Sequence, residues 1–429
     1  MVDAREPALL MSIWNDSEAA IIRELLASHG IECSVSSQVP HSVMPLTVDG
    51  LGEIRIHVPA PLLEEAQVIV AAYREVAPTA PDSAPPPQGV VLPMSHTARA
   101  PTRIDLAGGT LDIWPIFLLL DQPVTVNVAI DLHAVVEVSP LKDGRIELIS
   151  EDLDLYREAK DTAALAGEGS LPLPARLVRS FAPDGGVRMR TRATAPAGSG
   201  LGGSSALAAG MAVALSRLAG EKPTGDIHAL ARRLANLEAQ VLRIPTGVQD
   251  YYPALLGGVL KLTFAAEGIT TQRLPVNPEA LAQRLVLVYE GATRSSGLSN
   301  LDMLRRFLGD EGDTRDAMAA VAQAATDLAE ALVVGDLDAA GKAMGREMTA
   351  RRRLSPTIMT PATERLFTAA ATAGALGAKV CGAGGGGCSV YWAAAGRHRQ
   401  LAAALTAAGG QVLPFQVEPR GLLEGAPAK

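Results

Sequence analysis

Residues 195–206 contain the groups best suited to binding a phosphate. They read Ala-Pro-Ala-Gly-Ser-Gly-Leu-Gly-Gly-Ser-Ser-Ala and run directly into the helix-prone residues 207–218. Glycines let a loop turn its backbone N–H groups toward an anion, and a helix start adds unpaired N–H donors and the positive end of its dipole. The serine hydroxyls are available to a metal ion. The sequence therefore predicts a phosphate-binding loop followed by a helix.

Two common phosphate loops do not fit this segment. No G-x-x-x-x-G-K-[ST] run is present, which excludes a Walker loop. Gly198, Gly200 and Gly203 satisfy G-x-G-x-x-G, but a dinucleotide fold requires a buried parallel strand before that motif. Residues 186–193 instead alternate apolar with charged or polar side chains, as a strand with one wet face does, and Pro196 follows.

The segment resembles the second motif of the GHMP kinases, the superfamily of galactokinase, homoserine kinase, mevalonate kinase and phosphomevalonate kinase. Residues 99–112, Arg-Ala-Pro-Thr-Arg-Ile-Asp-Leu-Ala-Gly-Gly-Thr-Leu-Asp, resemble the first motif, and residues 379–389 resemble the third. The order of the three motifs is that of the family. The resemblance implies an α+β fold with an S5-like N-terminal half and a ferredoxin-like C-terminal half, and it implies ATP and Mg²⁺ as cofactors.

The resemblance also assigns roles around the nucleotide. Glu238, on a helix expected over 227–242, and Ser204 correspond to the Mg²⁺ ligands of relatives. The alternatives are a solvated helix-face residue for Glu238 and helix capping for the serines. Gly203 departs from similar sugar kinases, which have a serine there. The residues implied to bind the nucleotide are Pro196, Gly198, Ser199, Gly200, Leu201, Gly202, Gly203, Ser204 and Ser205.

Two further residues correspond to catalytic groups of the family. Asp250 matches the aspartate that acts as general base, and it follows a Pro-Thr-Gly turn that can direct a carboxylate into a cleft. Its alternative role is a helix N-cap. Arg103 matches the basic residue beside that aspartate and would stabilise charge on the transferring group, the alternative being a surface arginine on a strand.

The substrate class depends mainly on Asp112. An acid at the end of the first motif is typical of the sugar kinases, and a carboxylate can accept hydrogen bonds from two adjacent sugar hydroxyls. Leu111 replaces the usual threonine and leaves the sugar open. Arg294 resembles a heptose-kinase arginine, although a loop arginine bound only to water is an alternative. The residues implied to shape the substrate site are Asp112, Gly109, Arg294, Gly384 and Gly385, the two glycines of the third motif being positional rather than catalytic.

These features predict an ATP- and Mg²⁺-dependent kinase that phosphorylates a sugar, at the anomeric hydroxyl as in the relatives it most resembles. The alternatives are a mevalonate-type or other small-alcohol kinase of the same fold, and a nucleotide-binding regulator with little catalysis. The presence of Glu238, Asp250 and Arg103 argues against the regulator, because a sensor needs no base.

Composition limits the partners and the compartment. The 429 residues are 48% hydrophobic with a net charge of −8, which suits two or three buried cores and no basic face for nucleic acid. Three cysteines give no disulfide framework, and no apolar run is long enough to cross a membrane. We expect a cytoplasmic protein with a small-molecule sugar substrate, without nucleic-acid or membrane partners, and compatible with a homodimer.

The chain is expected to contain three folded parts. Residues 1–76 predict a small βαββα domain that resembles a short bacterial family associated with signal transduction, with a regulatory or assembly role and no reactive constellation. Residues 77–93 are proline-rich and predict an interdomain linker. Residues 94–270 and 271–425 would be the N-terminal and C-terminal kinase domains, the second including a long alanine-rich helix over 314–333.

Overall fold

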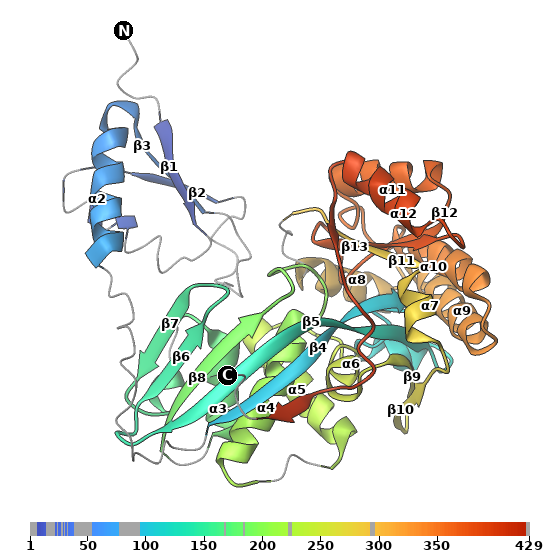
Figure 1. The fold of residues 1–429 in the computed structure, drawn as a ribbon, viewed down its shortest axis with the longest axis horizontal. Coiled ribbons are helices and arrows are strands. Elements are labelled where there is room, and N and C mark those ends of the chain that lie inside the picture. The colour runs from blue at the N-terminus through green and yellow to red at the C-terminus, as the bar shows by residue number, and fades with distance from the viewer. Residues whose placement is uncertain are drawn as a thin grey trace. The chain divides into compact units, whose positions relative to one another are not determined.

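The computed structural model of the chain describes residues 7–13, 22–23, 25–26, 29, 31, 33–37, 54–76, 95–166, 169–182, 185–221, 225–291 and 297–425. The chain divides into two compact units, residues 1–93 and 94–429, and each is described by itself (Figure 1). Within these ranges no helix combines the length and the apolar character needed to cross a membrane.

The first unit contains a three-stranded antiparallel sheet in the order β1-β3-β2, with the helix α2 in contact with it. Helical residues are also described at 22–23 and 25–26, inside the helix expected between the first two strands. The core includes Ile22, Leu26 and Ile56. The expected βαββα domain stays a prediction, and the expected linker, 77–93, lies outside the described residues. The elements are β1 (Pro7–Ile13), β2 (Ser34–Ser37), β3 (Ile54–Pro59), η1 (Ala60–Leu62) and α2 (Leu63–Val76).

A large mixed sheet forms the base of the second unit. Its strands run in the order β10-β9-β5-β8-β6-β7, with β4 paired to β5, and β6·β8 is a parallel pair among antiparallel ones. The sheet elements are β4 (His96–Ala107), β5 (Val124–Leu141), β6 (Ile146–Ser150), β7 (Leu155–Ala159), β8 (Gly186–Ala193), β9 (Val259–Ala265) and β10 (Gly268–Arg273), with the short η2 (Ile116–Leu119) and η3 (Ala164–Ala166) between strands.

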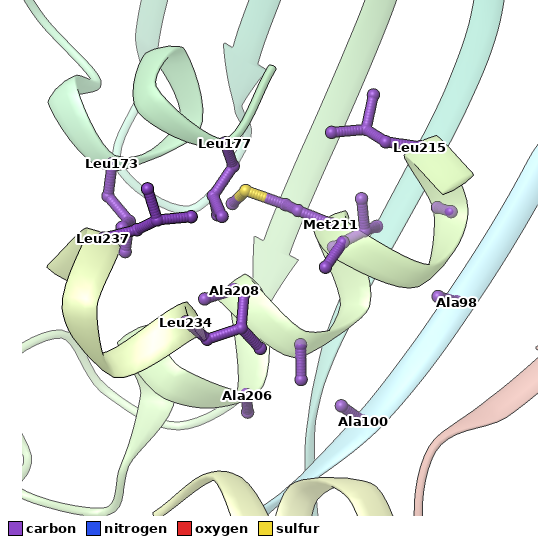
Figure 2. Close-up of a cluster of buried hydrophobic side chains, with 14 of the residues drawn as sticks. Ala98, Ala100, Leu173, Leu177, Ala206, Ala208, Met211, Leu215, Leu234 and Leu237 are labelled. Carbon is purple, nitrogen blue, oxygen red and sulfur yellow. The ribbon is translucent and has the colours of Figure 1, made fainter. Parts of the chain in front are cut away.

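Three helices cover one face of this sheet. Figure 2 shows Leu173 and Leu177 from α3, Met211 from α4 and Leu237 from α5 converging in one buried cluster. Small residues dominate α4 where it lies against β4 and β5, so helix and sheet approach closely. These three helices are α3 (Pro172–Phe181), α4 (Gly203–Leu218) and α5 (Ile227–Leu242), and the short α6 (Tyr251–Leu256) follows them in the chain.

The C-terminal half is built on a four-stranded antiparallel sheet in the order β12-β13-β11-β14. With its helices it has the βαββαβ order of a ferredoxin-like fold. Leu287 of β11 packs toward α9 and α10, while Val286 and Val288 pack toward α11 and α12. The elements are α7 (Pro278–Ala282), β11 (Leu285–Tyr289), α8 (Gly297–Leu308), α9 (Thr314–Val333), α10 (Leu337–Arg351), α11 (Pro361–Thr372), β12 (Ala375–Val380), β13 (Cys388–Ala393), α12 (His398–Ala407) and β14 (Gln411–Leu413).

The range expected for the C-terminal kinase domain, 271–425, needs correction at its start and at its end. The division at residue 270 falls inside β10, which pairs with β9 in the first sheet. The end of the chain also returns to that sheet: Val417 bridges Ile130, and β15 (Leu423–Gly425) pairs with β4. The edge of β4 offers unpaired N–H and C=O groups, and the returning strand satisfies them.

Candidate active site

The loop between β8 and α4 has the conformation expected of a phosphate-binding loop. Gly198, Gly200 and Gly202 have φ values of +68°, +75° and +72°, which are left-handed conformations that favour glycine. Gly202 is the N-cap of α4, and no side chain caps that helix. The first backbone N–H groups of a helix have no intrahelical partner. Those of α4 are therefore available to an anion.

The third motif packs directly against this loop. A Cβ atom on Gly200 would lie 2.5 Å from the carbonyl oxygen of Cys381, and the N–H of Cys388 donates to the Ser199 carbonyl at 2.9 Å. Gly385 donates its N–H to the carbonyl of Ile358 at 2.9 Å, so this donor is already used within the protein. Gly384 lies against the same residue. The contacts support the positional role expected for these glycines.

Arg103 and Asp250 form a bidentate ion pair beside the phosphate loop. The Arg103 Nε donates to Asp250 Oδ1 at 2.8 Å and a terminal nitrogen donates to Oδ2 at 2.7 Å. Another terminal nitrogen of Arg103 donates to the Gly200 carbonyl at 2.5 Å. Arg103 is almost fully buried, which excludes the surface arginine of the alternative interpretation. Burial opposes its charge, but Asp250 and Asp105 hold its pKa above the ordinary value.

Asp250 occupies the N-cap position of α6 but does not act as a cap. Its side chain makes no capping hydrogen bond, because both oxygens face Arg103. A Cβ atom on Gly202 would lie 3.2 Å from Asp250 Oδ2. The carboxylate is partly exposed, with 23% of the side chain accessible. It therefore lies at the rim of the phosphate loop with access to an incoming group.

Glu238 and Ser204 meet at the start of α4. The Ser204 hydroxyl donates to Glu238 Oε1 at 2.9 Å, and the Tyr251 hydroxyl donates to Oε2 at 2.7 Å. Glu238 is buried, so it is not the solvated helix-face residue of the alternative interpretation. Burial, and after it the negative charge of Glu238, hold the pKa of Tyr251 well above its ordinary range. The phenol therefore keeps its proton and acts as a hydrogen-bond donor. A carboxylate and a hydroxyl beside a phosphate loop are oxygen ligands of the kind that Mg²⁺ takes together with phosphates.

Asp112 lies next to the segment that carries Asp250. Its Oδ2 accepts the backbone N–H of Gln249 at 2.9 Å, and Gly247 approaches so closely that a Cβ atom there would overlap the carboxylate. Asp112 is buried, and burial raises its pKa to about 6 despite the bond from Gln249. The Oδ2 atom of Asp112 keeps one further lone pair and Oδ1 is not used by Gln249, so the contact with two sugar hydroxyls stays a prediction.

The remaining expected substrate residues have different outcomes. Gly109 is covered by protein, since a Cβ atom there would lie 2.1 Å from Asp105 Oδ2, and its carbonyl accepts from Arg351. Arg294 lies outside the described residues.

Sequence reasoning missed Tyr251, which holds Glu238, and Asp105, which lies two residues after Arg103. The strand period of two was a signal for Asp105, because it places both side chains on one face of β4.

Comparisons with known proteins agree with this architecture. Residues 173–258 match the GHMP kinases N terminal domain, and residues 328–411 match the GHMP kinases C terminal domain. The D-glycero-alpha-D-manno-heptose 7-phosphate kinase of Campylobacter jejuni is 28% identical over 76% of this chain and 97% of its own length. A mevalonate kinase of Thermococcus onnurineus is 26% identical over 77% of this chain and 98% of its own.

A larger relative and a solved structure extend the comparison. The L-fucokinase/L-fucose-1-P guanylyltransferase of Bacteroides fragilis is 29% identical over 67% of this chain, which spans 33% of that protein. The crystal structure of a D-glycero-D-manno-heptose 1-phosphate kinase from Bacteroides thetaiotaomicron superposes with a TM-score of 0.63, at 23% identity, over 78% of this chain and 100% of that one. The chain thus contains a GHMP kinase N-terminal domain and a GHMP kinase C-terminal domain, and relatives named as sugar and mevalonate kinases match most of its length.

Proposed function

We propose that this protein transfers the γ-phosphoryl group of ATP to a hydroxyl of a sugar or sugar derivative. The observation that supports this most directly is the Arg103–Asp250 pair at the edge of the phosphate loop. A carboxylate in that position would face both a nucleotide held by the loop and an acceptor hydroxyl brought to the same loop. Phosphoryl transfer depends mostly on positioning and charge stabilisation, and this arrangement supplies both.

Asp250 is proposed as the general base. Each of its oxygens accepts one bond from Arg103 and keeps a further lone pair, so the ion pair can persist while one oxygen accepts the hydroxyl proton. Arg103 orients the carboxylate and, through the Gly200 carbonyl, ties it to the loop that holds the phosphates. In this proposal the positive guanidinium stabilises the negative charge that develops on the transferring group.

The nucleotide is proposed to lie at the start of α4. The residues proposed for it are the loop 196–205, whose left-handed glycines leave the backbone donors free to turn inward. Ser204 and Glu238 would hold Mg²⁺, which supplies charge neutralisation on the phosphates when bound. Tyr251 keeps the Glu238 carboxylate turned toward Ser204 by its hydrogen bond to the other oxygen.

The acceptor is proposed to be a sugar that contacts Asp112. This carboxylate lies beside the loop carrying the base, with one oxygen fixed by Gln249. Relatives with sugar-kinase names match most of this chain, and one of them names a sugar 1-phosphate as the substrate of its second activity. These names support a sugar acceptor and phosphorylation at the anomeric hydroxyl.

An ADP-release screen tests the proposal. Hexoses, 6-deoxyhexoses, heptose phosphates and mevalonate are each supplied with ATP and Mg²⁺, with the Asp250→Asn variant as the background control. We expect a sugar to give the largest turnover, dependent on Asp250. The mevalonate kinases among the relatives make mevalonate the second candidate. If mevalonate alone is turned over, the acceptor is a small alcohol and not a sugar. If no compound gives Asp250-dependent turnover, the result favours a nucleotide-binding regulator.

A further inference from the structure

A buried cluster of four charged side chains joins the two halves of the larger unit. Asp105 comes from β4, Glu347 and Arg351 from α10, and Lys379 from β12, and none is more than 2% exposed. Lys379 Nζ donates to Asp105 Oδ2 at 2.8 Å and lies 3.7 Å from Glu347 Oε1. Arg351 Nε donates to Glu347 Oε1 at 3.1 Å. The two positive and two negative charges balance, as buried charges must.

Asp105 has three cationic neighbours, and one of them is the catalytic arginine. Lys379 makes the direct hydrogen bond, while Arg351 lies 3.9 Å away. Arg103 is two residues earlier on the same face of β4 and interacts electrostatically with Asp105. Burial opposes ionisation of Asp105, but Lys379, Arg351 and Arg103 hold its pKa below the ordinary value. Asp105 is therefore a carboxylate that competes with Asp250 for Arg103.

Asp105 also has unused capacity to accept a hydrogen bond. Within the described part of the chain, its Oδ1 is buried and accepts no hydrogen bond. Arg103, by contrast, uses both sides of its guanidinium on Asp250 and the Gly200 carbonyl. The ion pair with Lys379 is what satisfies the other oxygen of Asp105. Loss of Lys379 would leave two unsatisfied oxygens beside Arg103.

The same cluster holds the loop that ends at Asp112. The N–H of Gly108 donates to Glu347 Oε1 at 3.2 Å, and Arg351 donates to the Thr110 hydroxyl at 3.2 Å and to the Gly109 carbonyl. These bonds belong to Glu347 and Arg351. A variant of Lys379 therefore changes the charge beside Arg103 and leaves the direct bonds to the loop in place.

We propose that Lys379 is a positioning residue for phosphoryl transfer: by pairing with Asp105 it leaves Arg103 to hold Asp250. The proposal rests on the proposed roles of Arg103 and Asp250. When Lys379 is absent, Arg103 turns toward Asp105, and the base loses the bidentate contact that orients it. Misplacement of a reacting group by a fraction of an ångström to one ångström is costly to the chemical step and has little effect on substrate binding.

The test compares Lys379→Met with the double variant Asp105→Asn/Lys379→Met. Lys379→Met should lower kcat by roughly tenfold to a hundredfold per folded molecule, with KM for ATP and for the acceptor within about twofold of wild type. The double variant removes the competing carboxylate as well, so kcat should recover to within about threefold of wild type. Lys379→Arg keeps the charge and should retain most of the activity. The folded fraction is measured as the stoichiometry of ADP binding by calorimetry.

Arg284→Met is the matched control. Arg284 is also a buried cation of the C-terminal half, but it bonds to the Ala393 carbonyl and to Asp338 rather than to the first motif. Its loss should lower Tm and leave kcat per folded molecule unchanged. A merely structural role for Lys379 predicts the same pattern.

Three outcomes would overturn the proposal: wild-type kcat per folded Lys379→Met, a double variant no faster than the single one, or a fall in kcat equal to that of Arg284→Met. If Lys379→Met does not fold, the double variant carries the test alone, and a folded but inactive double variant refutes the idea. Full activity of Asp250→Asn would instead refute the role proposed for Asp250, on which this inference rests, and absence of turnover on any compound would refute the proposed function.

Discussion

Asp112→Asn is expected to remove the pH dependence that Asp112 gives to the KM for the sugar and to the free energy of unfolding. Burial raises the pKa of Asp112 to about 6, from an ordinary value of 3.8. A neutral carboxyl accepts hydrogen bonds poorly, so sugar binding should weaken as the pH falls through 6. At pH 5 about a tenth of the Asp112 side chains are ionised, and the KM for the sugar should be about tenfold higher than at pH 8. Asparagine, which does not titrate, should show no such rise.

The effect on stability has the opposite sign with respect to pH. Between pH 4 and 6 the folded protein holds the Asp112 proton more tightly than the unfolded chain does, so this residue's contribution to the free energy of unfolding falls as the pH rises through that window. A pKa difference of about 2 corresponds to about 3 kcal/mol, which is an upper limit for the loss at neutral pH. Asp112→Asn should therefore gain stability relative to wild type on going from pH 4 to pH 7.

Two measurements check this account of Asp112. Sugar KM is measured at saturating ATP from pH 5 to 8 for both proteins, with ATP KM as the internal control, and unfolding by urea is followed in the same buffers. Wild-type sugar KM that stays flat across this range would refute the reasoning. So would a pH dependence of the same size in Asp112→Asn, because another group would then be responsible.

Three further results are expected. Glu238→Gln and Ser204→Ala should each raise the Mg²⁺ concentration needed for half-maximal turnover, with Glu238→Gln also losing stability because the residue is buried against Tyr251; an unchanged Mg²⁺ dependence would remove the metal assignment. Gly200→Ala should lower the free energy of unfolding in urea by about 2 kcal/mol or more, because φ at Gly200 is +75° and the Cβ atom would meet the Cys381 carbonyl. Gly203→Ala should leave the free energy of unfolding unchanged, because a Cβ atom there meets open space. Equal losses of stability in the two variants would contradict the described packing. Removal of residues 1–93 should leave a folded, active kinase unit, and an insoluble remainder would show that the two compact units depend on each other.

Much of the kinase fold was predictable because local patterns and motifs agreed. The strand over 186–193 and the helices over 227–242 and 314–333 appear as β8, α5 and α9 with the expected bounds. Their apolar positions recur with the period of the element, and tertiary packing only reinforces that preference. The return of β15 to β4 was not predictable in the same way, because a three-residue strand has no periodicity and its partner lies more than three hundred residues earlier.

The candidate site shows the same limit. The first motif marked Arg103 and Asp112, and the loop before α6 marked Asp250, because family motifs preserve the groups that do chemistry. Glu238 was expected on a solvated face or on a metal, and its burial against Tyr251 depends on a contact that spacing does not reveal. The cluster around Asp105 joins three elements far apart in sequence, so only the folded chain shows that its charges balance.

We propose that Asp250 accepts the proton of the acceptor hydroxyl and does not serve as a helix cap. The most direct test of this proposal compares Asp250→Asn with Asp226→Ala, since Asp226 is a true N-cap whose side chain accepts from the N–H of Ala229 at 3.0 Å. Single-turnover phosphoryl transfer is measured together with ATP affinity and Tm. We predict that Asp250→Asn lowers the transfer rate by roughly a hundredfold or more at unchanged ATP affinity, while Asp226→Ala loses about 1 kcal/mol of stability and keeps its rate. Transfer at the wild-type rate in Asp250→Asn would contradict the account.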